Sequence, residues 1–96
     1  MSYENVREEF IKDAEEYINA KRKPFEKLSG TELDLAKYQY LENFQDYINF
    51  LNFRIIARLD ENLISFKNLE EATAFQEFLK PTFEVVARKY TEGLMD

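Results

Sequence analysis

Hydrophobic residues recur every three or four positions near the start of the chain, which predicts an amphipathic helix over about residues 3 to 22. Its apolar stripe consists of Tyr3, Val6, Phe10, Ala14, Tyr17 and Ile18. Ser2 is placed to cap the start of this helix. The basic run at 21–23 complements the negative end of the helix dipole, and Pro24 disfavours helical geometry at Lys23, so the helix should end there.

The longest periodic pattern covers about residues 31 to 59 and predicts a long central helix. Ser29 with Glu32, or Thr31 with Asp34, can form a capping box at its start. One face of this helix is continuously apolar and consists of Leu33, Ala36, Tyr40, Phe44, Tyr47, Ile48, Leu51 and Ile55.

Further apolar residues fall outside this main stripe. Leu35 and Tyr38 lie toward the start of the predicted helix, and Phe50, Phe53 and Ile56 lie toward its end. A helix that is apolar on two sides is either central to its own fold or contacts something outside it. Large aromatic residues are enriched at interface cores because they bury much area while fixing few torsions. These five residues are therefore the partner-binding candidates, and packing under the C-terminal helices is their alternative role.

The segment at about 53–67 has a second interpretation. Two runs rich in Ile, Leu and Phe flank Asp60-Glu61-Asn62, and such runs around a polar turn also suit a β-hairpin. The helical stripe that runs without interruption into Ile55 favours the helix.

Two shorter helices are predicted at the end of the chain. The first begins after Asn68, with Glu71 three residues later as in an N-terminal cap, and stops before Pro81. The second carries a stripe of Phe83, Val86, Ala87, Tyr90 and Leu94, and Gly93 lies where a helix C-terminus is expected.

These patterns predict an all-α fold: a single helical domain over residues 1–96, arranged as a compact three- to four-helix bundle with a long central helix. The alternative is an α+β fold with the hairpin at about 53–67. The chain contains nine Phe and six Tyr, which supply a large apolar area for a core of this size.

Charge and composition narrow the functional classes. The chain has 13 basic and 19 acidic residues, a net charge of −6, and neither Cys nor His. Disulfides, thiolate nucleophiles, serine–histidine triads and Cys- or His-ligated metals are therefore excluded within this chain. We expect no cofactor, no catalytic residues and no resident metal. A cytoplasmic location is expected, because the start of the chain lacks a signal-peptide pattern and no apolar run is long enough to span a bilayer.

The charged groups that remain have ordinary interpretations. The carboxylate pairs Glu8-Glu9, Glu15-Glu16 and Glu70-Glu71 lie beside apolar stripes rather than within them, which is typical of solvated helix faces. Basic residues gather at 21–27 and at Arg54 with Arg58, where they could contact single-stranded nucleic acid, but helix-end capping and solvation are the favoured explanation. Direct nucleic-acid binding is not expected from a chain this acidic.

The functional prediction is a non-catalytic protein-interaction module: a small accessory or regulatory subunit that docks on a larger intracellular assembly. Its partner is another protein or a second copy of the chain, and neither a membrane nor a small-molecule substrate is expected. The alternative is an acidic mimic of nucleic acid, of the viral inhibitor type, that uses Glu4, Glu8 and Glu15 to occupy a DNA- or RNA-binding protein. An accessory subunit of a nucleic-acid-processing machine is a related possibility.

Overall fold

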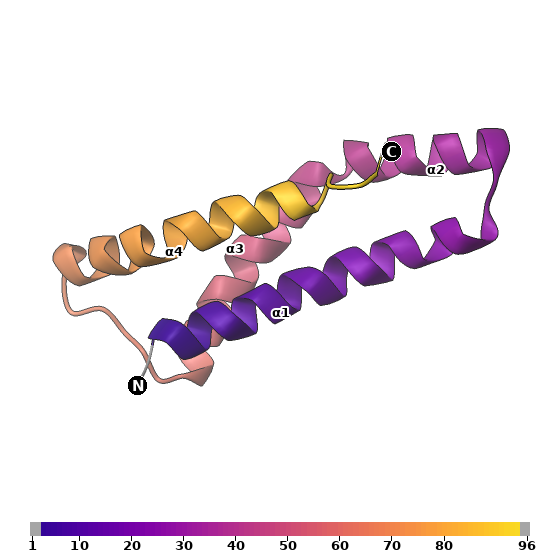
Figure 1. Cartoon of the computed structure of the whole chain (residues 1–96). Coiled ribbons are helices and arrows are strands. Elements are labelled where there is room, and N and C mark those ends of the chain that lie inside the picture. The colour runs from indigo at the N-terminus through magenta and orange to yellow at the C-terminus, as the bar shows by residue number, and fades with distance from the viewer. Residues whose placement is uncertain (1–2, 95–96) are drawn as a thin grey trace.

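The computed structural model describes residues 3–94 and contains four α-helices joined by short connections (Figure 1). The helices are α1 (Tyr3–Arg22), α2 (Gly30–Glu42), α3 (Phe44–Glu61) and α4 (Leu69–Lys89), and a 3-10 turn, η1 (Lys23–Lys27), follows α1. No strand occurs among these residues, so the all-α prediction is confirmed and the hairpin alternative at 53–67 is wrong. Helix α3 continues through most of that segment, as its uninterrupted apolar stripe requires.

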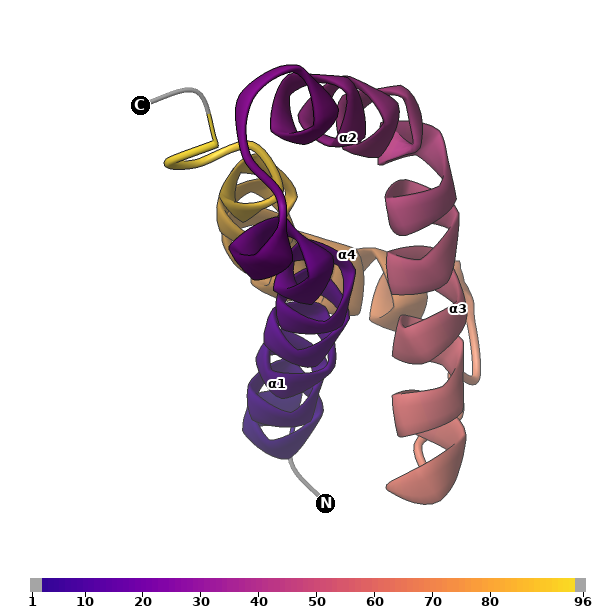
Figure 2. The same ribbon diagram turned by 90° about the vertical axis from the view of Figure 1, so that its right-hand side faces the viewer.

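The molecule is elongated, with principal extents of 53 × 19 × 18 Å and a radius of gyration of 15.8 Å. A compact domain of this length has a radius of gyration of about 12.5 Å. The prediction of a compact bundle is therefore wrong in shape, although the number of helices is right. Helices α1 and α4 run in the same direction along the long axis, whereas α2 and α3 run back (Figures 1 and 2). The helices lie side by side along only part of their lengths, so the molecule is longer than any single helix.

Helix α1 has the predicted bounds, and its buried face includes Val6, Phe10, Ala14 and Ile18. It ends where the basic run meets Pro24, which occupies the first turn of η1. The proposed cap at Ser2 lies outside the described residues. At α4 the predicted cap is present, since the Asn68 side chain accepts a hydrogen bond of 2.9 Å from the Glu71 N–H.

The predicted central helix is broken at Asn43, which has φ −89° and ψ 14° and separates α2 from α3. In a continuous helix the Phe44 N–H would donate to the Tyr40 carbonyl. That carbonyl instead accepts the Tyr90 hydroxyl and the Asn43 N–H. A side chain that enters the helical hydrogen-bond ladder is a known cause of a kink, and here it comes from the far end of the chain.

The two predicted C-terminal helices form one helix, because α4 continues through Pro81. The predicted stop before Pro81 is therefore wrong. Proline removes one hydrogen bond and costs about 3 kcal/mol inside a helix. Burial on both sides of Pro81 offsets this cost, since Phe75, Leu79 and Val86 all lie in the core. Pro81 itself is on the exposed side, where water can reach the carbonyl that lacks its usual donor.

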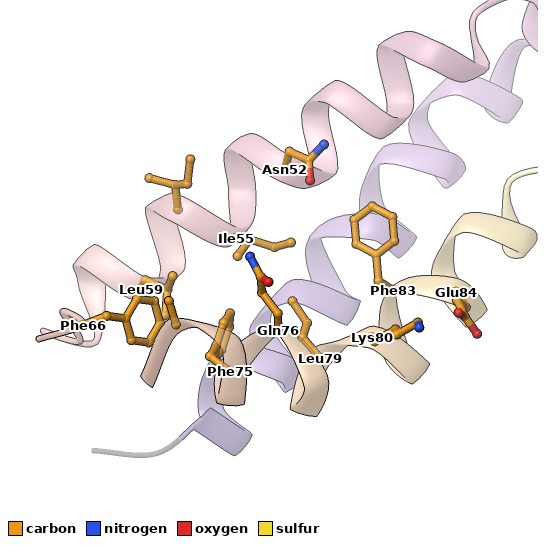
Figure 3. A pocket seen from close by; sticks show the side chains of 12 residues that line it. Asn52, Ile55, Leu59, Phe66, Phe75, Gln76, Leu79, Lys80, Phe83 and Glu84 are labelled. Atoms are coloured by element: carbon orange, nitrogen blue, oxygen red, sulfur yellow. The ribbon is translucent and has the colours of Figure 1, made fainter. Parts of the chain in front are cut away.

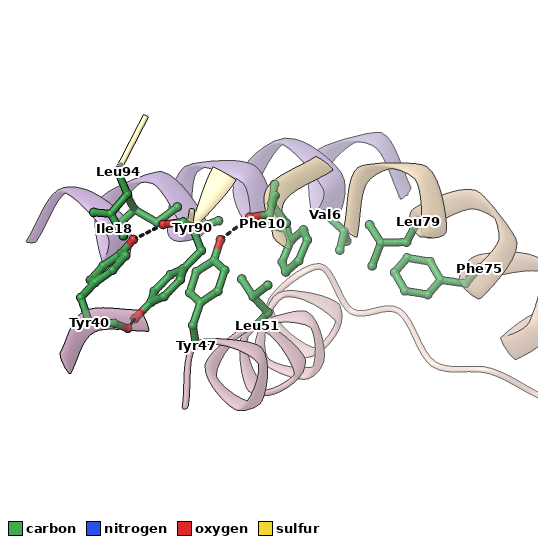
Figure 4. Packing of buried hydrophobic residues seen from close by; sticks show 12 residues of the cluster. Val6, Phe10, Ile18, Tyr40, Tyr47, Leu51, Phe75, Leu79, Tyr90 and Leu94 are labelled. Atoms are coloured by element: carbon green, nitrogen blue, oxygen red, sulfur yellow. Dashed lines mark hydrogen bonds between the residues drawn. The ribbon is translucent and has the colours of Figure 1, made fainter. Parts of the chain in front are cut away.

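The core runs along the long axis and is rich in tyrosine near the C-terminus (Figure 4). The rings of Tyr40 and Tyr90 stack with centroids 3.9 Å apart, and Tyr47 stacks on Tyr90 at 4.7 Å. Their hydroxyls donate to backbone carbonyls near helix ends: Tyr40 to Tyr90, Tyr90 to Tyr40, and Tyr47 to Val86. These carbonyls lie where helices leave acceptors without intrahelical donors. The tyrosines therefore fill the core and cap α2 and α4 at once.

Candidate functional site

An apolar groove with a volume of about 470 Å³ lies between α3 and α4 (Figure 3). It exists because α1 packs against both helices, whereas α3 and α4 make few contacts with each other. We call it the α3–α4 groove. Its lining residues are Asn52, Ile55, Ile56, Leu59, Phe66, Ala72, Phe75, Gln76, Leu79, Lys80, Phe83 and Glu84.

The floor of the α3–α4 groove is hydrocarbon and aromatic. Phe75 and Leu79 reach it from α4, and Leu59 faces them from α3 (Figure 3). Its charged lining residues are Lys80 and Glu84, which lie one helical turn apart with opposite signs. A groove with this lining suits apolar side chains and contains no cluster of groups suited to proton transfer or nucleophilic attack.

The five partner-binding candidates lie in three places: on the surface of α2, on the surface of α3, and, for Phe50, partly inside the fold. Leu35 and Tyr38 are 57% and 64% exposed on α2, and Phe53 and Ile56 are 65% and 61% exposed on α3. Of the five, Ile56 lines the α3–α4 groove. Phe50 is partly buried, with its ring centroid 4.5 Å from that of Tyr17. The structure therefore supports packing for Phe50 and leaves the other four on the surface.

Most of the groove was not nominated from the sequence. Phe83 was predicted to lie in an apolar stripe. In the structure Phe75 and Leu79 lie in the core and Phe83 packs against it, but all three also form one wall of the groove. A residue at the edge of a core stripe has the same periodicity whether or not another helix covers it. The distance between α3 and α4 decides which of these residues remain accessible. That distance cannot be derived from the periodicity of hydrophobic residues in the sequence.

Two further exposed leucines flank the connection between α3 and α4. Leu63 is 85% exposed and has a positive φ of 58°, a conformation that usually requires glycine. Its N–H bonds to the Asp60 carbonyl, and the Ile64 N–H bonds to the Leu59 carbonyl, which together form a Schellman motif. Leu69, at the start of α4, is 81% exposed. A large apolar residue in a strained, exposed position adds to the apolar surface near the groove.

A buried ion-pair network joins α1 to α3 on a different side of α3. Asp13 is 7% exposed and accepts two hydrogen bonds from Arg58, of 2.7 and 2.9 Å, and one of 3.1 Å from Arg54. Burial alone raises the Asp13 pKa, but the hydrogen bonds and charges of Arg58 and Arg54 outweigh burial and hold the pKa below its usual value of 3.8. Asp13 therefore stays ionised and acts as a structural anchor.

The basic residues that could have contacted nucleic acid are largely engaged elsewhere. Arg54 and Arg58 face Asp13. Arg22 donates to the Tyr90 carbonyl at 2.6 Å and to the Tyr40 hydroxyl at 3.2 Å, so it helps to cap α4. The Lys21 ammonium lies 5.5 Å from the Tyr17 ring centroid. Arg54 and Arg58 therefore do not form an open, positively charged surface of the kind that follows a phosphate backbone, whereas Lys23 and Lys27 are exposed.

The acidic residues remain on the surface of α1. Glu8 and Glu15 are exposed, and Glu15 lies 3.4 Å from the Lys89 ammonium. In the part of the chain that the structure describes, no three acidic side chains form a group that could hold a metal ion. No described helix is long and apolar enough to cross a membrane.

The chain was compared with known proteins by sequence and by structure. No protein-family model, curated protein or solved structure matches it. The functional argument therefore depends on the geometry of the α3–α4 groove and on the exposed residues around it.

Proposed function

We propose that this protein is a non-catalytic interaction module that receives a helix of another polypeptide in the α3–α4 groove. In this role it acts as a small accessory or regulatory subunit of a larger assembly. The observation that carries the proposal is the arrangement of the three long helices. Because α1 neighbours both α3 and α4, and those two make few contacts beyond the hydrogen bond from Tyr47 to Val86, the three helices occupy three corners of a four-helix bundle. The fourth corner is the groove.

The dimensions of the groove suit one short helix. The lining residues on α4 extend from Ala72 to Glu84, which at 1.5 Å per residue is about 18 Å. A partner helix of about twelve residues covers this length with apolar side chains at every third or fourth position. Each large apolar side chain that it buries contributes about 1.5 to 3 kcal/mol. Two to four anchors of this kind contribute about 3 to 12 kcal/mol, which is comparable to the cost of association, so we expect a complex of moderate affinity.

Photo-crosslinking tests this proposal in the full chain. A photoreactive phenylalanine analogue, p-benzoylphenylalanine, replaces Ile56 or Gln76 on opposite walls of the groove. The control places it at Tyr38, which is as exposed as Ile56 but lies on α2. We expect positions 56 and 76 to crosslink to one and the same peptide with helical apolar periodicity. Crosslinks from position 38 alone, or none from either groove position, would refute the groove as the binding site.

The acidic face of α1 supports a second candidate function, mimicry of nucleic acid. Its exposed carboxylates include Glu8, Glu15 and Glu16. Lys12 interrupts them and Glu15 pairs with Lys89, so the face is less uniformly negative than a phosphate backbone. A mimic should lose affinity for its target steeply as salt rises and in an E8Q/E15Q variant, whereas binding in the groove should change little under either condition.

A further inference from the structure

We propose that the helix received by the α3–α4 groove is α3 of a second copy, in a parallel two-fold dimer whose axis runs between the two α3 helices. This inference rests on the proposed function, because it identifies the polypeptide that the groove binds. It is carried by an uncharged stripe on α3, by the shape of the vacant corner and by the position of the exposed apolar residues.

The stripe consists of Gln45, Asn49, Asn52, Ile56 and Leu59, spaced by four, three, four and three residues. This is the spacing of the contact positions in a parallel coiled coil. Asn52, Ile56 and Leu59 also line the α3–α4 groove. The stripe therefore follows the edge where an additional helix would lie.

Absence of charge is the property that points to a second copy. One third of all residues in the chain are charged, yet none of the five stripe residues is. In a parallel two-fold pair each stripe residue faces its own counterpart, so any charge would face a like charge. The Asn49 side-chain oxygen accepts a hydrogen bond of 3.1 Å from the Gln45 amide of the same helix. The Asn52 amide both donates and accepts hydrogen bonds, so it complements itself across the axis. Asparagine at such positions fixes a parallel, in-register pairing.

In this arrangement the vacant corner is the place that the second α3 fills. A two-fold axis along α3 places each α3 in the groove of the other copy, beside its α4, and puts the two α1–α4 pairs on opposite outer sides. The contact surface is neutral, since the stripe is uncharged and the charges of Lys80 and Glu84 cancel. The carboxylates that produce the net charge of −6 include those on the surface of α1, which this packing keeps apart. Leu35 and Tyr38 on α2 lie outside this contact and remain exposed.

Sedimentation equilibrium on the full chain tests the dimer. We expect a mass of 23 kDa, twice the 11.5 kDa of one chain, with dissociation on dilution. Either Ile56→Glu or Ile56→Lys alone should weaken the dimer by roughly 100-fold, because each places like charges against one another at the axis. Mixing the two variants should restore a dimer that contains one chain of each. Tyr38→Glu, at an equally exposed position outside the stripe, should leave the dimer unchanged.

The outcomes of these experiments distinguish failure of the dimer from failure of the proposed function. Restoration by mixing supports the parallel two-fold contact, provided that circular dichroism shows each variant folded. A wild-type chain that stays at 11.5 kDa at millimolar concentration overturns the inference, as does a dimer that Ile56→Glu does not weaken. If such a monomer still crosslinks from position 56 to a different protein, the groove binds a heterologous helix and the proposed function stands. If it crosslinks to nothing, both proposals fail.

Discussion

The ion-pair network at Asp13 gives the sharpest prediction about what holds α3 in place. Asp13→Asn keeps the size and one acceptor oxygen of the side chain but removes its charge. Arg58 then loses a bidentate partner at 2.7 and 2.9 Å, and Arg54 loses one at 3.1 Å. Two guanidinium groups that are only 20% and 24% exposed then lie beside an uncharged amide, and Arg58 keeps its ion pair with Glu61 at 2.8 Å. We expect this variant to be strongly destabilised.

The size of the effect follows from the burial of the three groups. Removal of one partner from a buried ion pair costs about 3 to 5 kcal/mol, and partial exposure of the arginines places this site near the lower end. A loss of about 3 kcal/mol in the free energy of unfolding corresponds to a fall of roughly 12 to 24 °C in Tm for a domain of this length. Urea titration followed by far-ultraviolet circular dichroism measures the free energy directly.

The pH dependence gives an independent check. The Asp13 pKa is lower in the folded state than in the unfolded chain, where it is about 3.9. The folded state is therefore stabilised above that unfolded value, and the stabilisation is lost as the pH falls through the folded pKa. The difference in stability between the wild-type and Asp13→Asn proteins should be constant near neutral pH and should shrink below about pH 4.

A matched control is the exposed pair Glu15–Lys89, whose side chains are 52% and 36% exposed and 3.4 Å apart. Glu15→Gln removes the same kind of charge from α1 but should cost less than about 1 kcal/mol. If Asp13→Asn costs no more than Glu15→Gln, or if the two proteins keep a constant difference in stability down to pH 2, the network does not anchor α3 as argued.

Two other changes test the helix ends. Tyr47→Phe removes the 2.7 Å hydrogen bond to the Val86 carbonyl and should cost about 1 to 2 kcal/mol in urea titration, whereas Tyr38→Phe at the surface should cost nothing measurable. Burial raises the Tyr47 pKa, so the stability that its neutral hydroxyl provides should be lost as pH rises above about 10, and less so in the phenylalanine variant. Leu63→Gly should raise Tm and add about 1 kcal/mol to the free energy of unfolding, because glycine adopts a positive φ without strain. Leu63→Ala should give no such gain. Equal Tm values for the two variants would contradict the strain argument.

The local features of the sequence predicted the parts of the fold that depend on neighbouring residues. The bounds of α1 follow from its stripe, its basic end and Pro24, and all of these lie within one segment. The Asn68 cap likewise needs only Glu71, three residues later. These determinants act within one or two helical turns, so a single sequence contains them.

The two errors in helix bounds have causes that are distant in sequence. The break at Asn43 arises because Tyr90, fifty residues away, donates to the Tyr40 carbonyl. The continuity of α4 through Pro81 depends on burial of Phe75, Leu79 and Val86 against other helices. Local rules state what a proline or a helical stripe favours by itself, whereas tertiary contacts decide whether that preference prevails.

The candidate site was only partly accessible to sequence reasoning for the same reason. Exposure of Ile56 and Phe53 was anticipated because they lie outside the main stripe of α3. The groove itself requires knowledge that α3 and α4 both pack on α1 but make few contacts with each other. One signal was present and could have been used: the positions from Gln45 to Leu59 at alternating spacings of four and three carry no charge. The proposed dimer places this stripe at its contact surface.

The polar networks explain why the groove is open rather than collapsed. Near its start, α3 is tied to α4 by the Tyr47 hydroxyl and the Val86 carbonyl. Near its end, α3 is tied to α1 by Arg58 and Asp13. These two attachments draw α3 toward different helices, so α3 and α4 diverge over the segment that lines the groove. A groove held open by hydrogen bonds binds an incoming helix with little loss of conformational entropy. Asp13→Asn should therefore weaken association as well as folding, although Asp13 is not among the residues that line the groove.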